Sequence, residues 1–203
     1  MRLNNSKGKM IRVEGEQMKI VALGDSITEG YPFSPQESWV EYATRKLKIE
    51  IVNQGINGDF TQGMLERFPR DVISYNPTHV IILGGANDAY EGLPLSRVSA
   101  NFSAMVEKCS HYGIIPILGL STPSLLSSEE KFLAEYRNWL KDYANREKMV
   151  VIDFYTPFQR AIQAGGADKL YVDEVHPSIE GYRMMGETAV QRLDAIQPRG
   201  KWF

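Results

Sequence analysis

Residues 19–30 read KIVALGDSITEG, an apolar run that stops at a glycine, an aspartate and a serine. The four apolar residues from Ile20 to Leu23 do not alternate with polar ones, which is typical of a strand buried on both faces of a parallel sheet. Open parallel sheets bind their ligands beyond the carboxyl ends of the strands. The stretch therefore predicts the kind of sheet and the edge at which functional side chains should lie.

Four further apolar runs resemble the first, and segments with helical periodicity separate them. The five expected strands are Lys19–Leu23, Ile49–Asn53, Val80–Leu83, Ile114–Leu120 and Met149–Asp153. The expected helical stripes are Trp39, Val40, Ala43 and Leu47; Val98, Phe102, Met105 and Cys109; Phe132, Tyr136, Trp139 and Tyr143; and, in a helix starting near Ser178, Tyr182, Met185, Ala189, Leu193 and Ile196. This alternation predicts a three-layer α/β/α sandwich with right-handed crossovers around a five-stranded parallel sheet.

Three local signals refine these boundaries. Ser34–Glu37 resembles a capping box with proline at the first helical position, and Ser127 with Glu130 three residues later indicates a second helix start. Pro116 lacks a backbone N–H, so we expect regular pairing of the fourth strand to be confined to Ile117–Leu120.

Composition excludes several classes of function. Hydrophobic residues make up 43% of the chain and charged residues 24%, and the formal net charge is -2. Basic residues are interleaved with acidic ones, so no positive field is available for nucleic acid or an anionic membrane. Cys109 is the only cysteine, which rules out an intramolecular disulfide and a thiolate metal cluster. It lies on an apolar helical stripe and is expected to be a small buried hydrophobe.

The ends of the chain differ from its body. We expect one domain over residues 18–196, a tail or added edge element at 1–17 and a second tail at 197–203. Trp202 and Phe203 either belong to a disordered end or dock on the body or on a second subunit, so a homo-oligomer stays open. No apolar run is long enough for a signal peptide or a membrane span, which favours a cytoplasmic protein.

The strand exits hold most of the small and polar residues capable of chemistry. They are Gly24–Gly30, Asn53–Asp59, Gly84–Asp88 and a long loop that ends in Asp173–Pro177. Of the three histidines, His79 and His111 belong at the amino end of the sheet, whereas His176 follows a strand exit. His176 is therefore the plausible imidazole base.

Ser26 is the candidate nucleophile, because it follows the first strand and a serine hydroxyl needs a base within hydrogen-bond reach. Asp173 lies three residues before His176, so one turn of chain can bring its carboxylate to the ring and fix the tautomer. Asp153 at the end of the fifth strand is a rival orienting acid, and a turn followed by a helix cap is the structural alternative for the Asp173 segment.

An attack on an ester carbonyl also needs hydrogen-bond donors for the developing oxyanion. Gly58 could provide a backbone N–H, Asn87 a side-chain amide and Ser26 its own N–H. Taken singly, Gly58 could be a turn residue and Asn87 a cap. Four strand exits that converge on nucleophile, base and donors favour catalysis.

These residues resemble the four blocks of the SGNH, or GDSL-type, esterases and lipases. Ser26 stands in GDSITEG, Gly58 in NQGINGD, Asn87 in GGAND and His176 in DEVHP, in the order of the family and over residues 24–177. An extra Gly84 precedes the Gly-x-Asn-Asp of the third block, and no Gly-x-Ser-x-Gly elbow is present. The chain is most similar to small bacterial members near the thioesterase and lysophospholipase branch.

The resemblance implies a flavodoxin-like fold and ester hydrolysis through an acyl-enzyme, with no metal or other cofactor. Ser26 would attack, His176 would act as base and then as acid, and Ser26, Gly58 and Asn87 would form the oxyanion hole. The partner would be a small-molecule ester. A carbohydrate O-acetyl ester or an acyl-CoA thioester is an alternative substrate on the same machinery.

Two further questions stay open at this point. A flavodoxin-like binding module without catalysis is the alternative from a different class, although Asp25 and Glu29 in the first exit would repel a flavin phosphate. The acyl pocket could be lined by apolar residues beside the four blocks, which equally suit packing. These residues are Tyr31, Phe33, Phe60, Tyr90 and Leu93, with Leu125 and Leu126 as a mobile rim.

Overall fold

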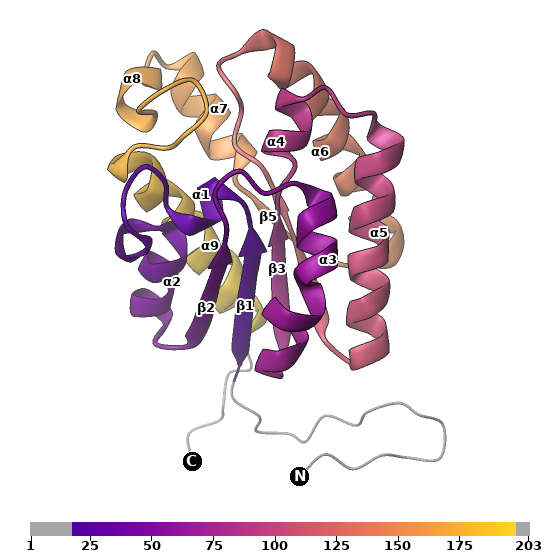
Figure 1. Cartoon of the computed structure of the whole chain (residues 1–203). Helices are drawn as coiled ribbons and strands as arrows, with labels where there is room; N and C mark the ends of the chain where they lie inside the picture. The colour runs from indigo at the N-terminus through magenta and orange to yellow at the C-terminus, as the bar shows by residue number, and fades with distance from the viewer. Residues whose placement is uncertain (1–17, 198–203) are drawn as a thin grey trace, which may run out of the picture.

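A computed structural model of the chain describes residues 18–197, so the segments at 1–17 and 198–203 lie outside the described residues. Five parallel strands form one sheet in the order β2-β1-β3-β4-β5 (Figure 1). The strands are β1 Lys19–Gly24, β2 Glu50–Gly55, β3 His79–Leu83, β4 Ile115–Leu120 and β5 Val150–Asp153. This order is that of flavodoxin-like sheets, with the chain reversing direction across the sheet beside β1 and β3. The predicted fold class is confirmed.

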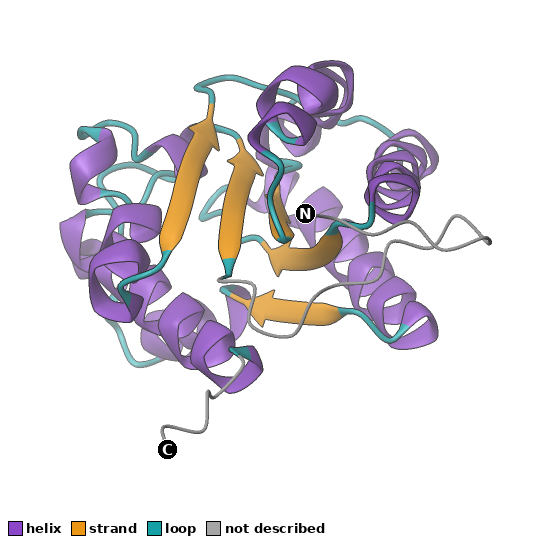
Figure 2. Ribbon diagram, turned by 90° about the horizontal axis from the view of Figure 1, so that it is seen from below, coloured by secondary structure: helices purple, strands orange, loops and turns teal. Residues whose placement is uncertain are grey.

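Helices cover both faces of the sheet, as the view from below shows (Figure 2). One layer contains α2 Trp39–Leu47, α7 Tyr155–Gln163 and α9 Ile179–Ile196, with the short α8 Ala167–Leu170 beside them. The other contains α3 Thr61–Asp71, α5 Leu95–Tyr112 and α6 Ser127–Glu147. The short helices α1 Ser26–Glu29 and α4 Ala86–Tyr90 follow β1 and β3 directly, and the 3-10 helices are Pro35–Glu37 and Ile73–Tyr75.

Strand β1 shows why the core divides into two layers. Successive side chains of a strand point to opposite faces. Ile20 and Ala22 therefore pack into the α2/α7/α9 layer, and Val21 and Leu23 into the α3/α5/α6 layer. All four are fully buried, which is what a run of apolar residues without alternation predicts. At about 25 cal/mol per Å² of buried apolar surface, these two layers supply the main stabilisation of the fold.

Pro116 affects the two neighbours of β4 differently. It is paired with Val80 of β3, so pairing on that side starts at Ile115, contrary to the prediction. On the β5 side pairing starts at Ile117, as predicted. The reason is the alternation of N–H directions along a strand. The N–H of Ile115 donates to Thr78 O on the β3 side, so the missing donor of Pro116 faces β5.

Two predicted helix starts are wrong in detail. Ser34 and Glu37 do form a capping box, but the turn that it caps is the 3-10 helix Pro35–Glu37. The α2 helix begins only after Ser38, whose Oγ accepts the N–H of Glu41 at 3.2 Å. Local polar residues cap both turns. The Ser34–Glu37 pattern therefore predicted a cap correctly, but the helix that follows this cap is the 3-10 helix and not α2.

The start of α6 is the second correction. Ser127 makes no side-chain cap there, and Leu126 stands at the cap position. Glu130 instead accepts the N–H of Ser124 at 3.0 Å, upstream of the helix. The last helix does start at Ser178 as predicted, because the Ser178 Oγ accepts the N–H of Gly181 at 3.1 Å.

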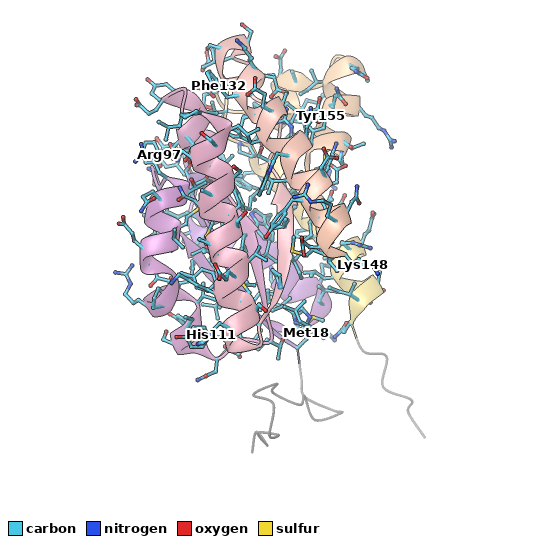
Figure 3. All side chains as sticks on the ribbon, turned by 90° about the vertical axis from the view of Figure 1, so that its right-hand side faces the viewer. Met18, Arg97, His111, Phe132, Lys148 and Tyr155 are labelled. Atoms are coloured by element: carbon cyan, nitrogen blue, oxygen red, sulfur yellow. The ribbon has the colours of Figure 1, made fainter. Side chains whose placement is uncertain are left out.

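The two remaining histidines lie at the amino end of the sheet, where the sequence places them. His79 begins β3, and its Nδ1 is 2.8 Å from Thr78 Oγ1. His111 lies in the last turn of α5, at the same end of the molecule as Met18 and opposite Phe132 (Figure 3).

Cys109 is fully buried, as expected, and burial raises the pKa of its thiol to about 12. Within residues 18–197, no helix is long and apolar enough to cross a membrane.

Candidate active site

Ser26 stands at the carboxyl end of β1, where the chain passes directly from strand to helix. Asp25 caps α1 by accepting the N–H of Ile27 at 3.0 Å, so Ser26 is the first helical residue. Gly24 permits the tight turn, since an added Cβ would lie 2.1 Å from Thr28 Oγ1 and 2.5 Å from Leu83 O. The side chain of Ser26 is thereby held at the edge of the sheet.

His176 approaches Ser26 from a loop that lies 150 residues further along the chain. Its Nε2 is 3.2 Å from Ser26 Oγ, and its Nδ1 is 2.8 Å from Asp173 Oδ2. The other carboxylate oxygen of Asp173 accepts the backbone N–H groups of Val175 and His176 at 2.8 and 2.6 Å. One carboxylate therefore orients both the ring and the loop that carries it.

Electrostatics assign the tautomer of this histidine. Burial of Asp173 by itself would raise the pKa of its carboxyl, but hydrogen bonds from His176 and Val175 outweigh burial and lower the pKa. An ionised carboxylate only accepts, so the ring proton lies on Nδ1, and Nε2 faces Ser26 with a free lone pair. This arrangement lets the imidazole accept the hydroxyl proton of Ser26.

The histidine loop is anchored to the exit of β4 by two hydrogen bonds. The N–H of Leu125 donates to Glu174 O at 2.8 Å, and the Tyr171 hydroxyl donates to Pro123 O at 2.6 Å. Both bonds join the loop after β4 to the segment that carries His176. Leu125 is thus joined to the histidine loop through its backbone.

Gly58 and Asn87 are the other predicted oxyanion donors; Gly58 lies on the loop after β2 and Asn87 in the first turn of α4, and one hydrogen bond joins these two segments. The Nδ2 of Asn87 donates to Asp59 O at 2.8 Å. The amide has two N–H groups, so one bond to Asp59 leaves a second donor that can serve a ligand. Gly58 has a φ of +77°, and a Cβ there would meet nothing within 4 Å. Backbone conformation rather than crowding requires glycine at this position.

Arg67, which the sequence reading missed, joins the ends of β1 and β2 to Asp59 on the loop after β2. Its guanidinium donates to Gly24 O at 2.8 Å and to Gln54 O at 3.1 Å, at the ends of β1 and β2. It also pairs with Asp59 at 2.6 Å and with Asp71 at 3.0 Å, and its side chain is 8% exposed. The sequence gives no sign of this contact, because an arginine among the polar residues of a helix is usually exposed to solvent.

Asp88 and Asp153, two further aspartates near the strand exits, have structural partners. Asp88 is fully buried and accepts the N–H and the hydroxyl of Thr61 at 3.0 and 2.6 Å, which joins α4 to the start of α3. Asp153, the rival orienting acid, accepts the N–H and hydroxyl of Thr156 in the first turn of α7 at 3.0 and 2.6 Å. Neither carboxylate contacts His176.

A cleft of about 340 Å³ opens over these groups. Its walls are formed by Ser26, Ala86, Asn87, Tyr90, Leu126, Glu129, Asp173, Glu174, Val175 and His176. Four of the predicted catalytic and oxyanion residues thus share one cleft, and Gly58 adjoins it through the Asp59–Asn87 bond.

The predicted pocket residues are divided. Tyr90 lines the cleft, but Tyr31, Phe60 and Leu125 lie outside its lining. Tyr31 packs edge-on against the His176 ring, with centroids 4.7 Å apart. Phe60 stands at the cap position of α3. Of the two leucines after β4, Leu126 lines the cleft and Leu125 does not.

The fold and this arrangement of side chains define an esterase-type hydrolase. The sequence profile of the GDSL-like lipase/acylhydrolase family matches residues 22–184. A solved G-D-S-L family protein from Desulfitobacterium hafniense is 36% identical with a TM-score of 0.76, covering 86% of this chain and 99% of that one. The chain therefore belongs to the GDSL-like lipase/acylhydrolase family.

Curated relatives extend the comparison. An arylesterase from Vibrio mimicus is 32% identical over 93 residues, which is 43% of this chain and 46% of that protein. The chain thus matches about half the length of this relative. An acetylxylan esterase from Geobacillus stearothermophilus is 24% identical over 212 residues, covering 88% of this chain and 95% of that protein.

Proposed function

We propose that this protein hydrolyses carboxylic esters through an acyl-enzyme on Ser26. The observation that carries the proposal is the continuous chain of contacts from Ser26 Oγ to His176 Nε2 at 3.2 Å and from His176 Nδ1 to Asp173 at 2.8 Å, at the wall of a cleft. A hydroxyl beside an oriented imidazole is the arrangement that nucleophilic acyl transfer needs.

In the proposed reaction, Ser26 Oγ attacks the ester carbonyl carbon and His176 Nε2 takes the hydroxyl proton. The negative charge moves to the carbonyl oxygen, which accepts hydrogen bonds from the Asn87 amide and from the backbone N–H groups of Gly58 and Ser26. Collapse of this intermediate breaks the bond to the alcohol, which leaves with the proton from His176. Water then repeats the sequence, releasing the acid and restoring Ser26.

Asp173 would stabilise the imidazolium that forms in each half of the reaction. Its two short bonds to the loop backbone hold the carboxylate still, so the ring has one orientation. The cleft, at about 340 Å³, is near the lower end of the range of about 300–1,000 Å³ for ligand pockets, which favours short acyl groups.

Acetyl esters of carbohydrates are a second candidate class of substrate. The support is the similarity to the acetylxylan esterase, which extends over most of both chains. A cytoplasmic location, the absence of a cofactor and assembly into a homo-oligomer stay predictions from the sequence.

Labelling by a fluorophosphonate probe, followed by peptide mass spectrometry, tests the nucleophile. The expected result is one label on Ser26, together with a loss of turnover of up to about 10⁶-fold in Ser26→Ala. Labelling of a different residue, or full activity in the alanine variant, would refute the proposal.

A further inference from the structure

Glu129 is a buried carboxylate in the wall of the cleft that holds Ser26 and His176. It lies in the first turn of α6, and 4% of its surface is exposed. Figure 3 shows this end of α6 through Phe132, at the opposite end of the molecule from His111. Glutamate is almost never buried to this extent unless it is paired, so a role for the charge is expected.

The contacts of Glu129 leave much of its acceptor capacity unused. Among the described residues, Ser124 Oγ donates to its Oε2 at 2.9 Å, and no Lys or Arg nitrogen lies within 4 Å of the carboxylate. The nearby cation is taken by the next residue, because Arg137 pairs with Glu130. A carboxylate can accept about four hydrogen bonds, so Glu129 can accept more from a ligand in the cleft.

The charge of the cleft also restricts the ligand. Three of the residues that line it are acidic, Glu129, Asp173 and Glu174, and the part of the lining formed by residues 18–197 contains no Lys or Arg. A leaving group that carries phosphates or carboxylates would meet like charges here. An aliphatic leaving group would desolvate the Glu129 carboxylate without giving it a hydrogen bond, which is also unfavourable.

We propose that Glu129 determines specificity by accepting hydrogen bonds from the hydroxyl groups of a neutral, polyhydroxylated alcohol that carries a short acyl group. This inference rests on the proposed function, since it names the substrate class of the same cleft. Glu129 is a binding residue in this scheme and takes no part in bond breaking. A hydrogen bond to an ionised acceptor is about twice as strong as one between neutral groups, so its loss should be measurable.

A matched pair of esters isolates the hydroxyl groups. Glycerol monoacetate and propyl acetate have the same acyl group and the same three-carbon alcohol, and differ in two hydroxyls. We expect the wild type to have a kcat/KM about tenfold to a hundredfold higher for glycerol monoacetate. Acetyl-CoA and acetylcholine complete the series. The acidic lining should repel the anionic acetyl-CoA, whereas acetylcholine tests the rival possibility that the same charges select a cationic leaving group.

Two variants test whether Glu129 causes the preference. Glu129→Leu removes the acceptor, so the ratio of the two kcat/KM values should approach one. Glu129→Gln can keep the Ser124 contact while losing the charge, so the ratio should fall to an intermediate value even if the leucine variant does not fold. The control is Glu135→Gln, an exposed change on the same helix, which should keep the wild-type ratio.

The outcomes separate this inference from the proposed function. Ser26-dependent hydrolysis of p-nitrophenyl acetate with equal rates on the matched pair would overturn the role of Glu129 and leave the proposed function standing. A ratio that Glu129→Gln does not change, or a preference for acetylcholine or acetyl-CoA, would overturn it as well. Absence of Ser26-dependent hydrolysis of every ester would overturn both.

Discussion

Asp25 offers a test of the electrostatics beside Ser26 that does not depend on the substrate. Its carboxyl is 1% exposed, and burial, with the charges of Asp88 and Asp59 adding to it, raises the pKa from 3.8 to about 7. The folded protein therefore keeps a proton on Asp25 that the unfolded chain releases above pH 3.8. Because the unfolded state binds fewer protons in this interval, stability falls as the pH rises from about 4 to about 7.

The size of the effect follows from the pKa values. At 1.36 kcal/mol per pH unit, ionisation of Asp25 costs the folded state about 4 kcal/mol at pH 8 relative to acid pH, of which about 3 kcal/mol arises above pH 5. Asparagine caps a helix about as well as aspartate and cannot ionise. Asp25→Asn should therefore gain about 3 kcal/mol over the wild type between pH 5 and pH 8.

Urea unfolding of both proteins across this pH range measures the difference directly. Glu37→Gln is the control. Hydrogen bonds from Ser34 lower the pKa of the exposed Glu37 carboxyl, so any change in stability from its titration lies below pH 5 and should not alter the comparison between pH 5 and pH 8. A difference between wild type and Asp25→Asn that stays constant from pH 5 to pH 8, or that shrinks, would refute the assignment.

Four other outcomes are expected from the site. Asn87→Ala should lower kcat by about 10²–10³-fold with little change in KM, as steady-state kinetics on a short-chain ester would show, and a near-wild-type kcat in a folded variant would remove Asn87 from the oxyanion hole. Asp88→Asn should lower the melting temperature but leave kcat close to the wild-type value, because Asp88 bonds to Thr61 N and Oγ1 and joins α4 to α3. Asp173→Asn should reduce kcat by about 10⁴-fold without unfolding the protein, since the wrong tautomer of His176 is favoured; retained activity would assign the orienting role elsewhere. Activity should survive EDTA, and a loss that a divalent ion restores would contradict metal independence.

The positions of the strands could be predicted because the signal is local. The apolar runs of the central strands, such as Ile20–Leu23 and Val80–Leu83, are buried on both faces of the parallel sheet. The observed strands therefore start and end within two residues of the predicted ones. The exits follow from the strands, so the positions of Ser26, Asn87 and His176 at one edge of the sheet were also predictable.

Contacts between distant segments could not be read in this way. Arg67 and Glu129 are charged residues in helices, and charged residues in helices usually face solvent. Only the packing of α3 under the ends of β1 and β2 turns Arg67 into a link between loops. Only the position of α6 beside α4 turns Glu129 toward the cleft.

The same distinction separates Leu125 from Leu126. Both are apolar, adjacent and exposed by similar fractions, 42% and 37%, yet Leu126 lines the cleft. Leu125 donates its backbone N–H to Glu174, 49 positions further along the chain, and this contact cannot be read from the local sequence. Local sequence determines which segments are strands, helices and exits, because burial and backbone preference act along the chain. The tertiary structure decides which side chains meet in the cleft, because hydrogen bonds and packing between segments set their directions.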